Sequence, residues 1–150
     1  TGKIVDYGME DPMNMGACMA PAAAEVLYQH FVDFGSKPED YDAVYTGDLG
    51  EVGKKILLHL LRENGYDLSK VHGDCGIEIY ENETQDTHSG GSGCACSAVV
   101  LASMIIPKII DGTWKKVLFV PTGALMSKTS FNEGENVAGI AHAILLEGVR

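Results

Sequence analysis

The stretch 88–98 carries the residues of this sequence with the clearest chemical potential. It reads His-Ser-Gly-Gly-Ser-Gly-Cys-Ala-Cys-Ser-Ala and leads into an apolar run that begins at Val99. A glycine turn that feeds the start of a helix points unpaired N–H groups outward and can hold an anionic group. The same small residues also suit a helix that packs closely against a neighbouring backbone. Both interpretations stay open at this point.

Hydrophobic periodicity predicts the elements that position this stretch. Strands are expected at 2–8, 42–46, 75–80, 116–121 and 136–146, and helices at 19–34, 50–64 and from the glycine turn to 110. Gly35 and Gly65 are typical helix ends, and Asp111 with Gly112 closes the central helix. Pro21 fits the first turn of the first helix, and Pro107 predicts a kink or an end near Ile106. The loop 122–135 shows no helical pattern.

The resulting order, β-α-β-α-β-α-β-β, predicts an α/β fold. Three βα units imply parallel strands with helices on both faces of the sheet. The last connection carries no helix, so the final strand should run antiparallel to its neighbour. We expect one five-stranded mixed sheet. His30 falls on the apolar side of the first helix and is interpreted as a histidine at the edge of the core.

Composition narrows the function classes. The chain has 150 residues, enough for one domain, and a net charge of −10. This charge argues against nucleic acid and against anionic membrane surfaces as partners. The longest apolar run, 97–106, is too short to span a bilayer. No charged-then-apolar leader opens the sequence, so we expect a cytoplasmic protein, and the start at Thr1 suggests a piece of a longer one.

The four cysteines form neither a disulfide framework nor a metal site in this interpretation. Cys94 and Cys96 are too close for a common disulfide and lack the second Cys/His pair of a zinc site. With Cys18 and Cys75 they are expected to be small buried thiols in a reducing compartment. Neither a metal nor another cofactor is predicted.

Six parts of the sequence carry a resemblance to a known family: 3–8, 11–24, 45–49 with 52–54, 74–76, 90–100 and 122–127. They resemble the stage V sporulation protein AD family, whose fold is thiolase-like. A sheet of five strands in which only the last is antiparallel is itself the half-unit of that fold.

The resemblance implies a function. Members have two such halves around a pseudo-twofold axis, and residues 1–150 would be the C-terminal half, without the N-terminal half. The family binds dipicolinic acid, pyridine-2,6-dicarboxylate, and helps to load it into the developing spore with other sporulation stage V A proteins. The chain would then be cytoplasmic, or peripheral at the spore inner membrane through these partners, with a connection to spore germination.

Comparison with the condensing enzymes of this fold argues against catalysis. Condensing enzymes of this fold hold a thioester oxygen with His and Asn from this half. The corresponding places read Thr46-Gly47-Asp48-Leu49 and Ser89-Gly90-Gly91-Ser92. His88 lacks the following proline of thiolases, and Thr122-Gly123-Ala124 lacks their late cysteine. Losing two oxyanion donors costs on the order of 3 kcal/mol each in barrier, so a binding module is favoured. A condensing acyltransferase of thiolase or ketosynthase III type, and a scaffold subunit with a vestigial pocket, are the alternatives.

The expected pocket is lined by small side chains, which leave room for a ligand, and by backbone N–H groups. A flat aromatic dianion or a similar small anionic ligand could lie there, next to the start of the central helix. Two alternatives stay open: the glycines serve only close packing, and Asp48 caps the helix that begins near Gly50. The residues expected to line the pocket are Asp48, His88, Ser89, Gly90, Gly91, Ser92, Gly123 and Ala124.

The central helix is apolar nearly all round. In isolation it would leave one apolar face without cover. We therefore expect this chain to form a homodimer in which a second copy takes the place of the absent half.

Overall fold

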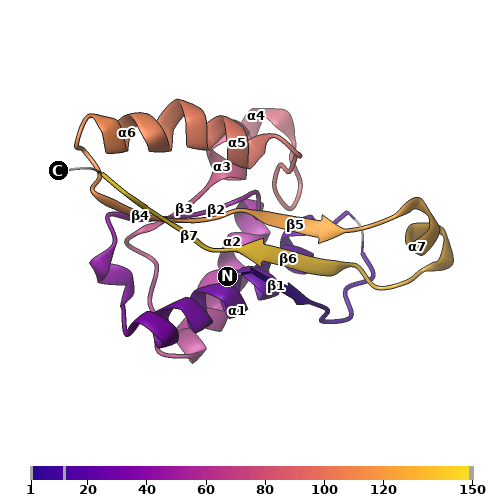
Figure 1. Cartoon of the computed structure of the whole chain (residues 1–150). Helices are drawn as coiled ribbons and strands as arrows, with labels where there is room; N and C mark the ends of the chain where they lie inside the picture. The colour runs from indigo at the N-terminus through magenta and orange to yellow at the C-terminus, as the bar shows by residue number, and fades with distance from the viewer. Residues whose placement is uncertain (1, 12, 149–150) are drawn as a thin grey trace.

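The computed structural model describes residues 2–11 and 13–148, and it is a mixed α/β structure (Figure 1). The strands are β1 (Gly2–Val5), β2 (Ala43–Thr46), β3 (His72–Asp74), β4 (Lys116–Val120), β5 (Thr122–Leu125), β6 (Ala138–His142) and β7 (Ile144–Glu147). The helices are α1 (Met15–Phe34), α2 (Gly50–Glu63), α3 (Cys75–Ile79), α4 (Asn82–Gln85), α5 (Cys96–Val100), α6 (Ile106–Ile110) and α7 (Lys128–Glu133).

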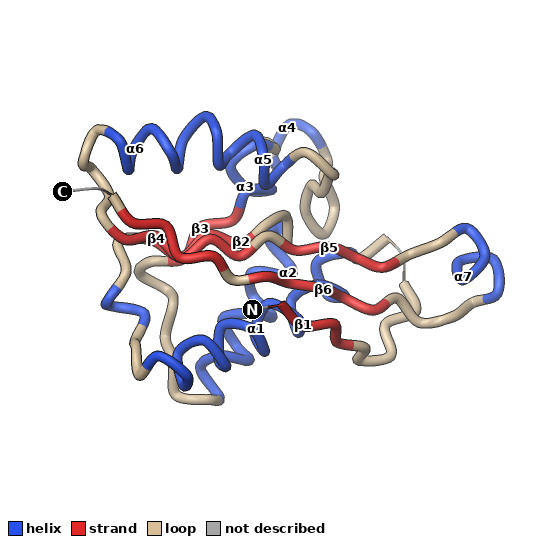
Figure 2. The backbone as a smooth tube through the Cα atoms, viewed as in Figure 1, coloured by secondary structure: helices blue, strands red, loops and turns tan. Residues whose placement is uncertain are grey.

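Two layers of helices cover β2 and β4, as predicted. Figures 1 and 2 show α1 and α2 on one side of these strands and α3, α5 and α6 on the other. The side chains alternate accordingly: Val44, Leu118 and Val120 join the core with α1 and α2, while Val117 and Phe119 join the core with α5. Because both faces are buried, β4 reads as a nearly continuous apolar run.

The prediction of a single five-stranded sheet is wrong. Two sheets form, with strand orders β1-β6-β5 and β3-β2-β4-β7. In the second sheet β2 is parallel to β3 and β4, and β7 is antiparallel to β4, as expected for the last strand. β6 and β7 are separated by Ala143 alone, so one segment contributes a strand to each sheet.

The strand predicted at 75–80 is also wrong. The parallel strand is β3, which ends at Asp74, and the following residues form α3. The side chain of Asp74 accepts hydrogen bonds from the amides of Gly76 at 3.1 Å and Ile77 at 3.3 Å. An N-cap of this kind starts a helix, and it outweighs the apolar alternation of Cys75, Ile77 and Ile79.

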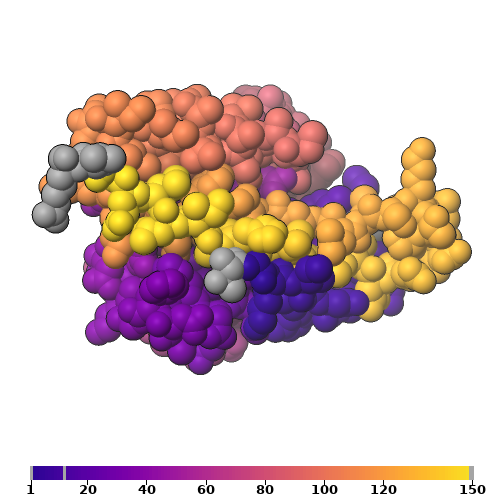
Figure 3. All heavy atoms as spheres, viewed as in Figure 1, coloured from indigo at the N-terminus to yellow at the C-terminus, as the bar shows by residue number. Residues whose placement is uncertain are grey.

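The region 122–146 was predicted to be a loop followed by one strand, but it forms β5, α7 and two further strands. Local hydrogen bonds account for the difference. Ser127 and Ser130 exchange hydrogen bonds in a capping box, and α7 ends at Gly134, whose φ is 68°. β5 pairs with β6 in an antiparallel ladder, so the expected loop is an arm of two strands joined through α7. Figure 3 shows this orange segment extending from the body of the molecule.

The central helix does not end at Pro107. Leu101–Ile105 forms a π-helical turn between α5 and α6, in which the Ile106 N–H donates to the Leu101 carbonyl. Proline lacks an N–H and would clash with the carbonyl four residues earlier in an α-helix. The wider turn just before Pro107 accommodates the ring and lets the helix continue to Ile110.

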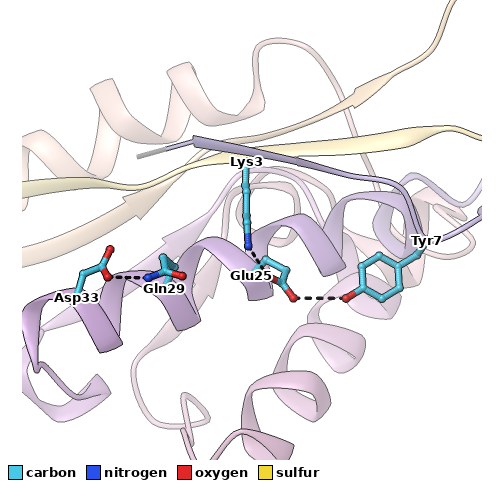
Figure 4. Close-up of polar contacts among 5 residues, drawn as sticks. All are labelled: Lys3, Tyr7, Glu25, Gln29 and Asp33. Carbon is cyan, nitrogen blue, oxygen red and sulfur yellow. Dashed lines mark hydrogen bonds and ion pairs between the residues drawn. The ribbon is translucent and has the colours of Figure 1, made fainter.

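Helix α1 is longer than predicted and is tied to β1. It begins at Met15, capped by Asn14, so Pro21 lies beyond the first turn, and it ends at Gly35. The Lys3 ammonium reaches Glu25 on α1 at 2.7 Å, as Figure 4 shows. His30 is half-buried, as expected for the core edge, and bonds the Tyr41 hydroxyl at 2.7 Å.

None of the helices in the described part of the chain is both long and apolar enough to cross a bilayer.

Buried His72 predicts a loss of stability in mild acid. Burial, and secondarily Lys54, lowers the pKa of His72 from 6.5 to about 3. The unfolded chain therefore binds the proton first, so stability is complete above pH 6.5 and falls as the pH decreases toward 3. At pH 5 this group alone should cost about 2 kcal/mol. Urea unfolding at pH 7 and pH 5 measures the difference.

The variant His72→Gln should flatten this pH dependence, because glutamine does not titrate. His59→Gln is the control, since His59 is exposed in its pair with Glu63. If His72→Gln keeps the full wild-type slope between pH 7 and pH 5, the neutral buried imidazole is not its cause.

Candidate functional site

A pocket of about 660 Å³ lies where α1, β5, α7 and the loop before α5 meet. Its wall is mainly apolar, with four methionines and a phenylalanine, and its polar residues come from the loop after β2, the glycine stretch and β5. The lining residues are Met13, Met15, Met19, Asp48, Ser92, Gly93, Cys94, Ser97, Thr122, Gly123, Ala124, Met126 and Phe131. This volume is in the range of small-molecule sites.

Asp48 is the charged residue of the pocket. It is 8% exposed, and one carboxylate oxygen accepts from the Ser92 hydroxyl at 2.6 Å and from the Gly93 amide at 3.0 Å. The other oxygen accepts from the Thr122 hydroxyl at 3.3 Å. Backbone N–H groups near the start of the central helix were expected to favour a ligand carboxylate, and that of Gly93 already donates to a carboxylate of the protein.

Asp74, not Asp48, caps the start of α2. Its carboxylate accepts from the amides of Leu49 at 2.9 Å and Gly50 at 3.0 Å and from the Thr46 hydroxyl at 2.6 Å. The interpretation of Asp48 as that cap is wrong, because the Leu49 and Gly50 amides donate to Asp74 and the Asp48 carboxylate accepts from the glycine loop and Thr122 instead. Burial raises the pKa of Asp74, against the hydroxyl and amide donors that lower it.

The glycines of the stretch serve close packing at two positions. A Cβ on Gly50 would lie 2.7 Å from the Gly90 Cα, and Gly90 has a φ of 136°. A Cβ on Gly91 would overlap the Tyr80 ring. Gly90 and Gly91 thus make the close contacts that the packing interpretation expects, and these contacts hold the loop against α2 and against the residue that follows α3.

His88 and Ser89 also lie outside the pocket lining. The His88 side chain is 81% exposed and faces Asp86 at 3.5 Å. The Ser89 carbonyl accepts from the Val52 amide at 3.0 Å, which fixes the loop to α2. His88 therefore has no place at this pocket in the structure.

Half of the predicted lining residues come together. Asp48, Ser92, Gly123 and Ala124 line the pocket, whereas His88, Ser89, Gly90 and Gly91 do not. Sequence reasoning missed the apolar wall and Thr122. A signal was present in the methionines of the loop 9–15, since methionine is frequent at adaptable binding surfaces.

The thiols differ in accessibility. Cys18, Cys75 and Cys96 are buried, as predicted, and burial raises the pKa of each. Cys94 is exposed and lines the pocket, so the expectation of four buried thiols is wrong at this position. Within the residues that the structure describes, no cluster of His, Cys, Asp and Glu is arranged to hold a metal ion.

Comparison with known proteins places these features in a family. The family model for stage V sporulation protein AD (SpoVAD) matches residues 1–147. This chain belongs to the stage V sporulation protein AD family. It is 45% identical over 146 residues to the stage V sporulation protein AD of Bacillus subtilis (strain 168), covering 97% of this chain and 43% of the relative. The chain thus spans less than half the length of this SpoVAD relative.

The Asp74 carboxylate should be a large contributor to stability. Asp74→Ala removes the acceptor of four amides and one hydroxyl, leaving buried donors unsatisfied. We expect the free energy of unfolding to fall by about 3 kcal/mol or more, measured by urea denaturation.

The matched control is Asp67→Ala, because that carboxylate is exposed and accepts from the Ser69 amide at 3.0 Å. Its cost should stay within about 1 kcal/mol. Equal losses for the two variants would contradict the role assigned to Asp74.

Proposed function

We propose that this chain is a non-catalytic, ligand-binding part of a SpoVAD protein, and that its ligand is dipicolinic acid. Membership of the SpoVAD family supports a role in sporulation. The observation that carries the binding role is the pocket itself, in which an adaptable methionine wall surrounds a polar floor. In this proposal the bound acid is taken up into the developing spore.

The polar groups of the pocket support binding over condensation. No histidine or asparagine is among its described lining residues, so the pair expected of a condensing enzyme has no counterpart there. The Ser92 hydroxyl and the Gly93 amide donate to Asp48 and are not free for a thioester oxygen. A scaffold with a vestigial pocket is disfavoured by the open volume of about 660 Å³.

The proposed architecture is a thiolase-like half-unit. Its support is the strand order: if β4 and β5 are taken as one strand interrupted at Pro121, and β6 and β7 as one interrupted at Ala143, the order is β3-β2-β4 with β5, then β6 with β7, then β1. The strand formed by β6 and β7 is antiparallel to β4, β5 and β1. The helices on both faces agree with this arrangement (Figure 1).

The proposed partners are an N-terminal half, other sporulation stage V A proteins and the small ligand. The central helix leaves Val99, Ile106 and Ile110 exposed by 49%, 41% and 80%, an apolar face that a further half would cover. The proposed location is the cytoplasm, or the spore inner membrane through partners.

A homodimer is the form we propose for the 150-residue chain alone, with the helix face in its interface. Light scattering should report a dimer mass at about 100 µM, and Ile110→Glu should shift it toward the monomer by burying a charge. A monomeric wild type would contradict this assembly.

Alkylation of Cys94 tests whether dipicolinate occupies the pocket. Iodoacetamide should modify Cys94 first, because the other three thiols are buried. Dipicolinate at ten times its dissociation constant should slow this reaction about tenfold, since only the free protein reacts. The rate is followed by mass spectrometry on the intact protein that contains this chain.

Cys94→Ser is the control for labelling of other thiols: the peptide that carries residue 94 should remain unmodified in this variant on the same timescale. An alkylation rate that dipicolinate leaves unchanged, whether because it binds elsewhere or does not bind, contradicts the proposed function.

A further inference from the structure

Asn64 and Gly65 form the one Asn-Gly pair of the sequence. Because glycine has no Cβ, its backbone nitrogen can approach the side chain of the preceding residue with the least steric hindrance. The pair therefore places a side-chain amide next to the least hindered backbone nitrogen that an asparagine can have. The other four asparagines precede larger residues, and they are Asn14, Asn82, Asn132 and Asn136.

The pair lies in the turn that ends α2, away from the pocket. Asn64 is the C-cap of α2, and both residues are exposed. Gly65 has a φ of 86°, and a Cβ added to it would meet no heavy atom within 4 Å. Water and hydroxide can therefore reach the peptide bond that joins the two residues.

The α2 cap holds the two reacting groups apart. The Asn64 side-chain amide donates to the Leu60 carbonyl at 2.8 Å, and the Gly65 amide donates to the Arg62 carbonyl at 3.0 Å. The ψ of Asn64 is 8°, which turns the Gly65 nitrogen away from the Asn64 side chain. Rotation about this soft dihedral requires that the hydrogen bonds open, and exposed helix ends open at a low free energy. The cap thus determines how often the pair reaches a reactive geometry.

We propose that Asn64 is a site of spontaneous modification, in which the Gly65 nitrogen displaces the side-chain amide as ammonia. A base removes the Gly65 N–H proton, and the nitrogen forms a bond to the Asn64 Cγ. The bond between Cγ and Nδ2 then breaks, and ammonia leaves with a proton from water. Water opens the resulting cyclic imide at one of its two carbonyls, which gives aspartate or isoaspartate at position 64. The net reaction consumes one water and releases one ammonia, and it requires neither the pocket nor a ligand.

The modification should loosen the end of α2. A carboxylate cannot donate to the Leu60 carbonyl, and its charge lies at the negative end of the helix dipole. Isoaspartate also adds one carbon to the backbone beside Tyr66. The Tyr66 amide donates to the Leu61 carbonyl at 2.9 Å, and the Tyr66 ring centroid lies 4.9 Å from that of Phe31. The link between the helix end and the core is therefore weakened in the product.

Incubation of the intact protein that contains this chain at pH 8 tests the proposal. Proteolysis and mass spectrometry measure the amide-to-acid mass change at each asparagine. Asn64 should convert at least about tenfold faster than Asn132, an exposed internal control whose next residue is glutamate. The rate at Asn64 should rise several-fold from pH 6 to pH 8, because the attacking nitrogen must lose its proton. Conversion at Asn64 that is no faster than at Asn132 overturns the proposal.

Two controls test the mechanism and the role of the cap. In Asn64→Gln the backbone nitrogen would have to close a larger ring, so this variant should keep its amide on the same timescale. Conversion at the wild-type rate would exclude backbone attack. The synthetic peptide 60–68 lacks the rest of the helix and should convert about tenfold faster than the folded protein. Equal rates in peptide and protein would contradict control by the α2 cap.

Asn64→Asp reproduces one product and tests the effect on stability. It should lower the urea midpoint of the intact protein more than Asn64→Ala does. Both variants lose the donor to Leu60, whereas only aspartate adds a negative charge at the helix end. An aspartate variant that is as stable as the alanine variant contradicts the weakening assigned to this charge.

Discussion

The buried carboxylate of Asp74 is the interaction on which the site depends. It joins the end of β2, the first amides of α2 and the first amides of α3 through five hydrogen bonds. Because Asp74 satisfies the amides of Leu49 and Gly50, the neighbouring Asp48 is free to reach the glycine loop instead. Asp74 thus fixes the first turns of α2 and α3, whereas Asp48 fixes the residues that line the pocket.

Asp48 explains why the glycine loop, although rich in hydrogen-bond donors, does not present those donors to an external anion. Small residues such as Gly90 let the loop approach α2 closely, and Ser92 and Gly93 then meet Asp48. The loop is ordered by an internal anion, in the way a bound phosphate orders such loops elsewhere. A protein with a net charge of −10 can therefore use its own acidic side chains as structural acceptors.

Elements whose signals are local could be predicted from the sequence. The apolar spacing of α1 and α2 and the buried runs of β2 and β4 repeat over several residues and agree with their end signals. At 75–79 the alternation of apolar residues predicts a strand. The helix forms instead because Asp74 caps it, and a single capping residue is a weaker sequence signal than a pattern that extends over five residues. At Pro107 the π-helical turn has no sequence signature of its own.

The candidate site was predictable where the order of strands and helices determines it. Asp48 follows β2, Gly123 and Ala124 follow β4, and Ser92 precedes the central helix, so topology alone brings them near each other. The direction of His88 depends on the backbone at φ 52°, and the partner of Gly91 is Tyr80, the residue that follows α3. The methionine wall joins two distant segments, 13–19 and the residue after β5, and only the folded chain shows that they meet.

The segment 138–147 has a consequence for how this molecule opens. β6 and β7 lie on either side of Ala143 and belong to different sheets. If the hydrogen bonds of β6 break in one sheet, the adjoining strand β7 is therefore disturbed in the other, and the reverse also holds. Partial opening confined to one sheet is therefore suppressed, and the backbone amides of both ladders should exchange with solvent in a single cooperative event. The arm that forms one side of the pocket is coupled in this way to the four-stranded sheet.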